Sequence, residues 1–324
     1  MSKAIRIVEN GGPEVMQFIE VDIPAPANDE VTLRHESIGL NFIDVYYRTG
    51  LYKQALPAGL GMEAAGVIEA VGNNVKHLAV GDRVAYACLP PGAYAQRRTM
   101  PASNVLKLPD TIEFDTAAAT MLQGLTVQYL FRQTFPLRGG ETILFHAAAG
   151  GVGLIACQWA RALGVTMIGT VGSDEKAALA RAHGCTHTIN YKTENIVERV
   201  KEITGGEGVP VVYDSVGKDT FYASLDCLAP LGMMVSFGNA SGPVPPFSLS
   251  ELASRGSLFI TRPTLFSYAS SRERLERMAA ELFEVLEAGK VAPIISARYP
   301  LSDVASAHAD LESRATTGSI LLKP

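Results

Sequence analysis

The stretch ETILFHAAAGGVGLIACQWARALG, residues 141–164, reads as a strand, a glycine turn and a helix without a break. After the apolar strand come three alanines and then Gly150, Gly151 and Gly153. Small residues allow a tight bend, and glycines let backbone N–H groups and a helix N-terminus approach phosphate oxygens. Ala148 takes the place of the first glycine in the G-x-G-x-x-G pattern, so the turn alone is weak evidence and a ligand-free connection is the alternative. Its position between a strand and an amphipathic helix predicts dinucleotide binding.

The residues after the second expected strand, 165–170, indicate which dinucleotide is bound. Ser173 lies twenty residues after Gly153, about where an NAD-binding unit has the Asp or Glu that holds its ribose. A hydroxyl in that place, followed by Lys176, suits a 2′-phosphate, which needs a cationic partner. The sequence therefore predicts NADPH as the cofactor. The alternative for Lys176 is an ordinary solvated helix residue.

The composition is that of an ordinary globular protein. The 324 residues exceed the usual size of one domain, so two domains are expected. Hydrophobic residues make up 47% of the chain and charged residues 19%. A net charge of −5 with no long basic run argues against a dedicated nucleic-acid surface.

Targeting and redox signals favour a cytoplasmic protein. The N-terminal segment MSKAIRIVEN lacks the apolar core of a signal peptide. The four cysteines are far apart and form no CxxC pair, which is typical of reduced, structural thiols. The uncharged residues 142–160 are long enough for a membrane span, but their glycine-rich centre favours a buried strand, turn and helix.

Hydrophobic periodicity divides the chain into three parts. Residues 1 to about 120 are typical of short strands separated by turns, and from residue 115 to residue 132 the pattern becomes helical. Strands and helices then alternate, as in a parallel doubly wound sheet. The expected strands are residues 165–170, 186–190, 209–213 and 232–237, and the expected helices are residues 174–183, 194–204 and 219–229, with Ser173 and Thr193 as N-caps. Past residue 263 the pattern changes to helices at 271–289 and 303–314 and a strand at 319–322, which we expect to complete the N-terminal domain.

Six short segments carry a resemblance to a known family. They are NFIDVYYRTGLY (41–52), GLGMEAAG (59–66), FHAAAGGVG (145–153), VYDSVG (212–217), SFGN (236–239) and LESRAT (311–316). Through them the whole chain resembles the zinc-free, zeta-crystallin-like quinone oxidoreductases of the medium-chain dehydrogenase/reductase superfamily. The resemblance implies an α/β protein with a GroES-like, β-rich catalytic domain (residues 1–122 and 264–324) and a Rossmann NADPH-binding domain (residues 123–263).

The zinc-dependent alcohol dehydrogenases of the same superfamily give the sharpest contrast. Their catalytic zinc is held by a cysteine, by the histidine of a Gly-His-Glu segment, and by a later cysteine or acid. Here that segment reads Gly61-Met62-Glu63, and no cysteine precedes Cys88. Zinc needs thiolate or imidazole donors, so we expect no metal site. A conjugated, electrophilic quinone accepts hydride without a Lewis acid, whereas alcohol oxidation depends on one.

The resemblance also assigns roles to single residues. The expected catalytic residues are Asn41, Asp44 and Tyr46, with Tyr46 or water as the proton donor. The expected cofactor contacts are Asn41, Tyr46, Tyr129, Ala149, Gly150, Gly151, Val152, Gly172, Ser173, Lys176, Tyr191, Ser215, Phe237, Gly238, Asn239, Arg262, Thr264 and Arg314. Ser173, Lys176, Tyr191 and Arg314 are expected around the 2′-phosphate. The alternative for Tyr46 is a core aromatic, and for Asp44 a helix cap; His146 is given no chemistry.

The implied reaction is NADPH-dependent reduction of a quinone by direct hydride transfer in a homodimer. A reductase of α,β-unsaturated aldehydes or ketones is the first alternative, because the hydride chemistry is the same. Relatives of zeta-crystallin also act as lens structural proteins or bind AU-rich RNA, but the acidic balance and the absence of a recognisable RNA module favour neither role. The apolar residues 257–261 are a candidate sheet edge for pairing with a second copy.

Overall fold

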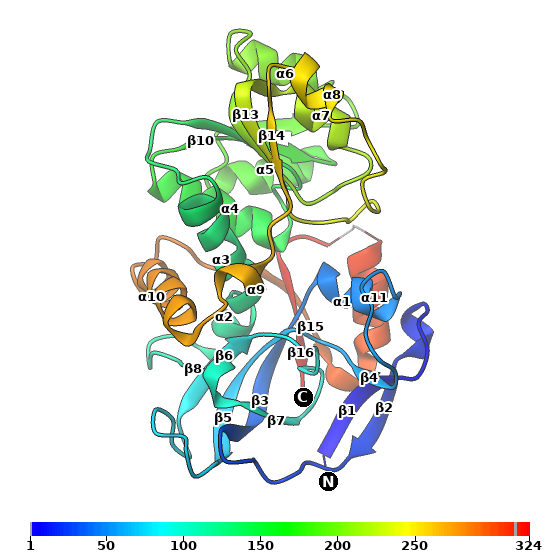
Figure 1. Ribbon diagram of the computed structural model, residues 1–324, viewed down its shortest axis with the longest axis vertical. Helices are drawn as coiled ribbons and strands as arrows, with labels where there is room; N and C mark the ends of the chain where they lie inside the picture. The colour runs from blue at the N-terminus through cyan, green and yellow to red at the C-terminus, as the bar shows by residue number, and fades with distance from the viewer. Residues whose placement is uncertain (1, 314–315) are drawn as a thin grey trace. The chain divides into compact units, whose positions relative to one another are not determined.

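The computed structural model describes residues 2–313 and 316–324, and the chain divides into two compact units. Unit 1 comprises Met1–Leu125, Ala269–Gly289 and Pro293–Pro324, and unit 2 comprises Thr126–Tyr268 and Lys290–Ala292 (Figure 1). The domain limits expected from the sequence, at residues 122/123 and 263/264, stay a prediction. None of the helices in the described residues is long and apolar enough to span a membrane.

Unit 2 is built on a six-stranded parallel sheet. Its strands are β9 (Thr142–Phe145), β10 (Thr166–Val171), β11 (His187–Asn190), β12 (Val209–Asp214), β13 (Leu228–Ser236) and β14 (Phe259–Thr261). They lie in the order β11-β10-β9-β12-β13-β14, and every neighbouring pair is parallel. This is the order of a doubly wound dinucleotide-binding sheet, whose direction of winding reverses between its first and fourth strands. Here that switch point lies between β9 and β12.

The helices of this part of the chain follow the strands in alternation. They are α3 (Met121–Tyr129), α4 (Gly151–Ala162), α5 (Asp174–Ala182), α6 (Ile196–Ile203), α7 (Phe221–Asp226), α8 (Ser250–Ser254) and α9 (Leu265–Tyr268). Apolar side chains fill the space between sheet and helices, among them Leu144, Ile168 and Phe221. Because both faces of the parallel strands are covered, β10 and β12 are almost continuous runs of buried residues.

One local expectation for this region is confirmed and one is wrong. The helical pattern expected at 115–132 is confirmed, as α2 (Phe114–Ala118), α3 and a π-helical turn, Leu130–Thr134, with a short break after Ala118. The N-cap of α6 is Asn195, whose side chain accepts from two backbone N–H groups, and not Thr193. Thr193 instead turns back on the preceding strand, since its N–H and its hydroxyl both donate to the carbonyl of Asn190.

Unit 1 contains a seven-stranded sheet and a separate three-stranded one. The larger sheet has the order β15 (Ile295–Pro300), β16 (Ser319–Lys323), β3 (Glu30–Leu40), β5 (Glu63–Val71), β6 (Arg83–Ala87) and β8 (Leu106–Lys107), with β7 (Arg97–Pro101) paired to β3. The smaller sheet is β2 (Gln17–Val21), β1 (Ser2–Ile7) and β4 (Ala58–Gly59). Antiparallel pairing of β16 with β3 brings the last strand of the chain into the N-terminal sheet.

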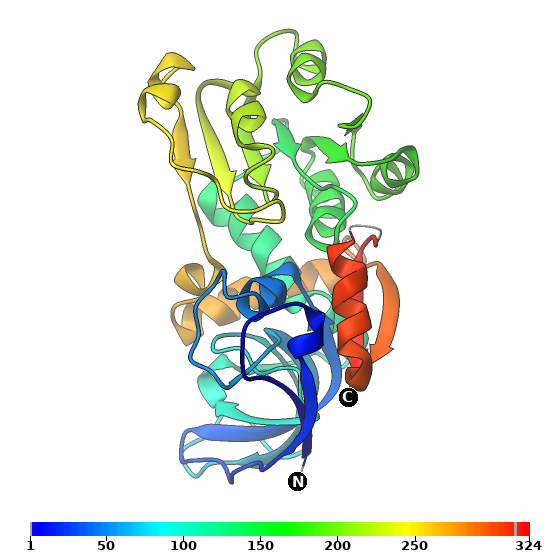
Figure 2. The ribbon, with the colours of Figure 1, turned by 90° about the vertical axis from the view of Figure 1, so that its right-hand side faces the viewer.

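The helices of unit 1 are α1 (Phe42–Arg48), α2, α10 (Arg272–Glu287) and α11 (Val304–Glu312). Figure 2 shows α11 alongside β15 and β16, which it contacts. Short 3-10 turns occur at Pro13–Val15, Ala102–Asn104 and Leu301–Asp303. The core of this unit includes Leu33, Ile38, Tyr86 and Leu322, all of them fully buried.

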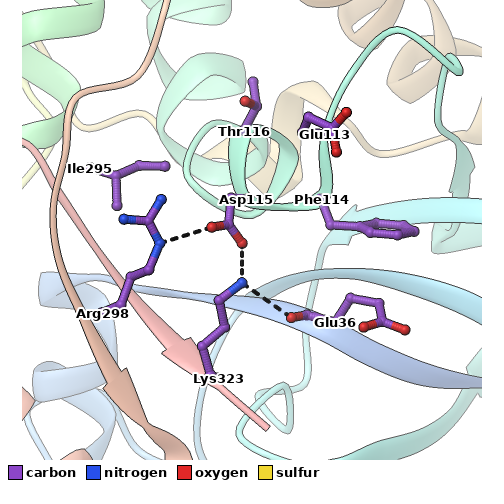
Figure 3. A pocket seen from close by; sticks show the side chains of 8 residues that line it. All are labelled: Glu36, Glu113, Phe114, Asp115, Thr116, Ile295, Arg298 and Lys323. Atoms are coloured by element: carbon purple, nitrogen blue, oxygen red, sulfur yellow. Dashed lines mark hydrogen bonds and ion pairs between the residues drawn. The ribbon is translucent and has the colours of Figure 1, made fainter.

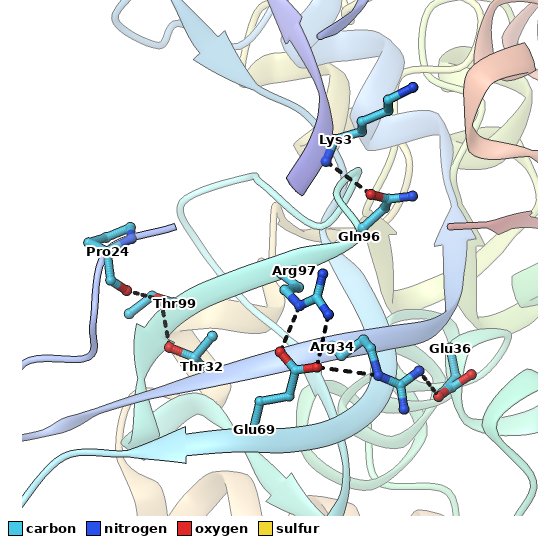
Figure 4. A network of polar contacts seen from close by, with 9 residues as sticks. All are labelled: Lys3, Pro24, Thr32, Arg34, Glu36, Glu69, Gln96, Arg97 and Thr99. Carbon is cyan, nitrogen blue, oxygen red and sulfur yellow. Dashed lines mark hydrogen bonds and ion pairs between the residues drawn. The ribbon is translucent and has the colours of Figure 1, made fainter. Parts of the chain in front are cut away.

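A network of charged side chains covers the outer side of β3, β5 and β7 (Figure 4). Glu69 accepts from Nε and Nη2 of Arg97 at 2.7 and 3.3 Å, and Nε of Arg34 lies 3.4 Å from the same carboxylate. Arg34 also pairs with Glu36. These side chains are about one-third exposed or more, so water solvates the network.

Candidate functional site

The turn between β9 and α4 has the geometry of a phosphate cradle. Ala147 has φ +58°, in the left-handed region, and its carbonyl accepts from the N–H of Gly150 at 3.0 Å. A Cβ on Gly153 would lie 2.3 Å from that carbonyl oxygen, so only glycine lets the helix pack this closely on the turn. Gly150 caps α4 without a side-chain hydrogen bond. The N–H groups of the first helical turn therefore point out of the helix end toward a site for an anion.

This turn holds four of the predicted cofactor contacts: Ala149 and Gly150 in the bend, and Gly151 and Val152 in the first turn of α4. It follows the carboxyl end of β9, at the switch point of the sheet, which is where open α/β sheets bind ligands. The structure thus places the predicted pyrophosphate contacts together.

A second group of predicted contacts follows β10 and β11. Ser173 caps α5 as expected, since its hydroxyl accepts from the backbone N–H of Lys176 at 3.3 Å. Tyr191 directly follows β11, and a Cβ on Gly172 would lie 2.6 Å from its hydroxyl oxygen. Gly172, Ser173, Lys176 and Tyr191 therefore meet at one corner of the sheet. Because Ser173 replaces an acidic residue there, the corner offers a hydroxyl and a cation to a ribose phosphate.

Lys192 belongs to the same corner and was missed by the sequence reasoning. Burial lowers the pKa of Lys176, and the neighbouring charge of Lys192 lowers it further. Two ammonium groups that repel each other are a favourable setting for a phosphate dianion. The available signal was the second lysine directly after Tyr191, at the end of the third strand of the doubly wound pattern.

The remaining predicted contacts of unit 2 follow β12, β13 and β14. A Cβ on Gly238 would lie 2.4 Å from the carbonyl oxygen of Ser215, so these two backbones touch. Arg262 donates to the carbonyl of Gly238 at 3.0 Å. Asn239, with its amide oxygen turned toward Arg262, accepts from Nη2 at 3.1 Å and donates to the same carbonyl at 2.9 Å. The ring of Phe237 packs on Phe145 of β9, with centroids 5.6 Å apart.

Two predicted contacts stand apart from these groups. Tyr129 is buried and its ring is stacked on Tyr268, with centroids 4.7 Å apart and planes 11° from parallel. Thr264 lies in the loop between β14 and α9. Arg314 lies outside the described residues, so its predicted phosphate contact stays a prediction.

His146 is a packed structural residue. It is fully buried after β9, with Nδ1 3.0 Å from the hydroxyl of Thr170 and Nε2 3.0 Å from the hydroxyl of Ser224. Ser224 in turn donates to the buried Asp214 at 2.7 Å. Burial lowers the pKa of His146, which keeps the imidazole neutral at physiological pH.

The predicted catalytic residues of unit 1 surround the start of α1. Asn41 is the N-cap, and its backbone N–H donates to the carboxyl group of Asp44 at 2.9 Å. Tyr46 follows one turn later and is 8% exposed, with its ring 5.2 Å from that of Tyr52. Asn41 is also 8% exposed, so each side chain shows only a small part of its surface.

A buried carboxyl group, Glu63, holds the side chain of Asn41 and was missed by the sequence reasoning. Glu63 Oε1 accepts from Asn41 Nδ2 at 2.6 Å, and Oε2 accepts from the backbone N–H of Leu122 at 2.6 Å. Gln123 donates to the oxygen of the same Asn41 amide at 3.1 Å. Burial raises the pKa of Glu63 to about 8, although both hydrogen bonds oppose the shift.

Asp44 is the centre of a second buried network. It accepts from Tyr94 at 2.9 Å, the Tyr94 hydroxyl lies 3.1 Å from His308 Nε2, and Arg48 lies 2.9 Å from His308 Nδ1. Burial raises the pKa of Asp44 to about 7. Burial, together with the charge of Arg48, lowers the pKa of His308 to about 3. Asp44 therefore combines the expected contact to the helix N-cap with a network that extends to α11.

Comparison with known proteins shows the family. Residues 27–110 match the alcohol dehydrogenase GroES-like domain, and residues 151–284 match the zinc-binding dehydrogenase model. The chain is 56% identical to the quinone oxidoreductase of Pseudomonas aeruginosa and 51% identical to quinone oxidoreductase 1 of Escherichia coli, with all of each chain covered. The chain belongs to the quinone oxidoreductase family. This confirms the resemblance carried by the six short segments.

Two further relatives bear on the fold and the chemistry of this quinone oxidoreductase family member. The crystal structure of E. coli quinone oxidoreductase complexed with NADPH is 50% identical and has a TM-score of 0.98, covering 99% of this chain and 100% of that one. The 2-haloacrylate reductase of Burkholderia sp is 46% identical over 100% of this chain and 99% of that protein. The expected pairing of a GroES-like domain with a Rossmann domain is confirmed.

The matched dehydrogenase model is named for zinc, but the donors in this family member do not fit that metal. Met62 occupies the histidine position and is fully buried, and a thioether does not replace an imidazole. Burial raises the pKa of the Cys88 thiol, which disfavours the thiolate that zinc binds. Among the described residues, no group of three or more His, Cys, Asp or Glu side chains could hold a metal ion.

A polar hollow of about 460 Å³ lies elsewhere in unit 1 (Figure 3). It is lined by Glu36, Glu113, Phe114, Asp115, Thr116, Ile295, Arg298 and Lys323. Both of its cations are paired with Asp115: Arg298 donates at 2.9 Å, and Lys323 donates from the end of β16. These pairs tie α2 to β15 and β16, so we assign the hollow a structural role.

Proposed function

We propose that this protein is an NADPH-dependent quinone reductase that transfers hydride to its acceptor without a metal. The observation that carries the proposal is the full-length similarity to quinone oxidoreductases at more than half identity. The corner of Gly172, Ser173, Lys176 and Tyr191 supports the choice of NADPH, because it has no carboxylate at Ser173 to hold a free 2′-hydroxyl. Two relatives of known structure, from E. coli and from a mycobacterium, are described in complex with NADPH.

The residues of the chain have separate tasks in this proposal. Bound NADPH supplies the hydride from its nicotinamide ring. The turn after β9 binds the pyrophosphate through backbone N–H groups, and Lys176, with Arg314, binds the 2′-phosphate. Asn41 donates a hydrogen bond to the acceptor oxygen, on which negative charge develops during the transfer. Tyr46 or water returns the proton to that oxygen.

The first experiment is a direct assay of NADPH oxidation with 1,4-benzoquinone as the acceptor. We expect turnover with NADPH, weak turnover with NADH, and no loss of activity after treatment with a zinc chelator. About one tightly bound zinc per chain in elemental analysis would contradict the metal-free proposal. Absence of turnover with a panel of quinones would contradict the activity itself.

Reduction of activated alkenes is the second candidate function. It is favoured by the 46% identity to 2-haloacrylate reductase over the whole chain. The same bound cofactor and the same hydrogen-bond donor serve a conjugated alkene as well as a quinone. The two candidates are separated by comparing kcat/KM for 1,4-benzoquinone with that for a 2-alkenal and for 2-chloroacrylate.

We further propose a cytoplasmic homodimer that pairs through β14. This strand ends the six-stranded sheet, and Phe259 on it is 56% exposed. An unpaired edge with an exposed aromatic residue favours pairing with a second copy. The four free, buried cysteines agree with a reducing compartment. Light scattering should give twice the chain mass, and Phe259→Lys should shift it toward the monomer, whereas Ile19→Lys on the edge strand β2 should not.

A further inference from the structure

Glu63, at the start of β5, is fully buried and both of its carboxyl oxygens are used. One accepts from the side-chain amide of Asn41 and the other from the backbone N–H of Leu122, both at 2.6 Å. A buried carboxyl group raises the free energy of the folded state unless its partners are well placed. The presence of this carboxyl group in the core therefore suggests a function for Asn41, the residue whose side chain it binds.

The hydrogen bonds around Asn41 fix the orientation of its amide. Asn41 Nδ2 donates to Glu63, and Asn41 Oδ1 accepts from Gln123 Nε2 at 3.1 Å. Gln123 Oε1 in turn accepts from the hydroxyl of Ser319 at 2.9 Å, on β16. The hydrogen-bond partners of each amide fix its orientation. Turning the Asn41 amide over would place its N–H groups against the N–H groups of Gln123 and its oxygen against an oxygen of Glu63.

The space around the carboxyl group leaves little freedom. A Cβ on Gly39 of β3 would lie 2.3 Å from Glu63 Oε1 and 2.3 Å from the carbonyl oxygen of Ala118. Gly39 is therefore required for Glu63 to reach Asn41. The backbone N–H of Asn41 is held as well, by Asp44 at 2.9 Å.

One donor of this fixed amide stays available. Nδ2 carries two N–H groups, and Glu63 accepts from one of them. Within residues 2–313 and 316–324, the second N–H of Asn41 makes no hydrogen bond. Asn41 is 8% exposed, so a small part of its surface can meet a ligand.

We propose that Glu63 is a positioning residue for the proposed quinone reduction: it accepts one N–H of Asn41 and so aims the second at the acceptor oxygen. The inference rests on the proposed function and adds a residue to it. A donor held in place before the reaction stabilises the charge that develops on that oxygen at no cost in reorganisation. Glu63 touches neither acceptor nor cofactor in this scheme and acts only through Asn41.

The chemistry of the pair suggests its own test. Glu63→Gln keeps one oxygen but turns an amide N–H toward either Asn41 or Leu122, where another N–H already points. The exchange Asn41→Asp combined with Glu63→Gln restores complementary partners, because the new carboxylate at position 41 accepts from the new amide at position 63 and from Gln123. That double variant recovers the hydrogen bonds but has no N–H left for the acceptor.

The experiment measures kcat, KM for NADPH and the thermal unfolding midpoint of the wild type and these variants, with Glu69→Gln on the same strand as a matched control. For Glu63→Gln we expect kcat to fall about tenfold or more, with KM for NADPH within about twofold and a lower midpoint. The double variant should recover the midpoint while kcat stays low. Glu69→Gln should change kcat and KM by no more than about twofold and should lower the midpoint less than Glu63→Gln does.

If the wild type reduces quinones, three results would overturn the proposal. The first is a kcat of Glu63→Gln within about twofold of the wild type. The others are a double variant that recovers both kcat and the unfolding midpoint, or a double variant that recovers neither of them. A wild type that binds NADPH but reduces no quinone would instead contradict the proposed function, and the inference would fall with it. The two failures are therefore distinguishable.

Discussion

Two regions of the molecule use polar groups in different ways. One is the predicted nucleotide site of unit 2, with the turn after β9 and the corner of Gly172, Ser173, Lys176 and Tyr191, here called the nucleotide corner. The other is the carboxyl cluster of unit 1, which comprises Asp44 and Glu63 with their partners Asn41, Tyr94 and Gln123.

In unit 2 the backbone N–H groups at the start of α4 and the residues Ser173 and Lys176 follow the carboxyl ends of parallel strands, where a dinucleotide is expected to bind. In unit 1 Asp44 and Glu63 are fully buried, and both oxygens of Glu63 and Oδ2 of Asp44 accept from protein donors. An anionic ligand brings the negative charge to the first kind of site, whereas buried carboxyl groups depend on hydrogen-bond donors of the protein itself.

This difference determines which substitutions each region tolerates. The turn after β9 depends on backbone conformation, so added side-chain volume there is harmful whatever its polarity. The cluster around Asn41 depends on hydrogen-bonding groups, so changes of equal volume are harmful when they reverse a donor and an acceptor.

The largest effect is expected at Gly153, where the backbones of the turn and α4 are in contact. A Cβ would lie 2.3 Å from the carbonyl oxygen of Ala147, and neither backbone can move away independently. Gly153→Ala should lower the free energy of unfolding by about 3 kcal/mol and abolish NADPH binding. Gly150→Ala is the matched control, because its Cβ would lie 3.3 Å from the same oxygen. Equal losses in the two variants, measured by chemical denaturation, would refute the close-packing argument.

The burial of Asp44 should make the free energy of unfolding depend on pH. Burial raises the pKa of Asp44 to about 7, above its value in the unfolded chain, so the folded state binds the extra proton between these values. Stability therefore falls as pH rises toward 7, and the full penalty is present above it. Asp44→Asn retains an oxygen for Asn41 and Tyr94 and removes the charge. The stability of the variant relative to the wild type, measured as free energy of unfolding, should therefore be greater at pH 8.5 than at pH 5 by roughly 2–3 kcal/mol.

The new amide N–H of Asp44→Asn costs the same at both pH values, so it cancels in this comparison. Glu36→Gln, at a partly exposed position on β3, serves as the control for the same exchange of a carboxyl group for an amide. If the difference for Asp44→Asn is the same at pH 5 and pH 8.5, the raised pKa of this carboxyl group is wrong.

The same contrast explains what the sequence could predict. The turn after β9 and the N-cap Ser173 are local, since their residues are neighbours in the chain and glycine or serine has a distinct backbone role there. Strand and helix alternation then yields the parallel sheet, because it limits the possible topologies. The helical pattern at 115–132 was predictable as well, but it does not reveal the break between Ala118 and Met121.

The carboxyl cluster could not be predicted in the same way. Asn41, Glu63 and Gln123 are far apart in sequence. The pairing of β3 with β5 brings Glu63 to Asn41, and Gln123 reaches Asn41 from α3. Nothing in the local sequence marks Glu63 as buried, because a glutamate on a strand is more often solvated. Its position next to Met62, in the segment that differs from the zinc enzymes, was the one available signal.

At the nucleotide corner, Lys176→Ala should weaken NADPH binding by roughly 1.5–3 kcal/mol, or about ten- to a hundredfold, and leave NADH nearly unchanged. NADH carries no 2′-phosphate, so its binding should depend little on Lys176. The carboxylate of Asp174, two residues before Lys176, accepts from the side-chain amide of Asn190 at 2.9 Å. Fluorescence titration with both cofactors measures the change, and Lys192→Ala should show a smaller loss. Equal weakening of both cofactors by Lys176→Ala would refute the 2′-phosphate assignment.

The smallest effect is expected where carboxylate and cations meet in water, in the network of Arg34, Glu69 and Arg97 (Figure 4). Glu69 pairs with two arginines, yet its side chain is 32% exposed, so solvent screens the attraction. Glu69→Gln should lower the free energy of unfolding by about 0.5–1 kcal/mol at low salt, and by less at high salt. Urea denaturation at two salt concentrations measures both values. The prediction is wrong if Glu69→Gln lowers the free energy of unfolding as much as Gly153→Ala does, or if salt does not reduce the loss. Solvent exposure would then not distinguish Glu69 from the buried carboxyl groups of unit 1.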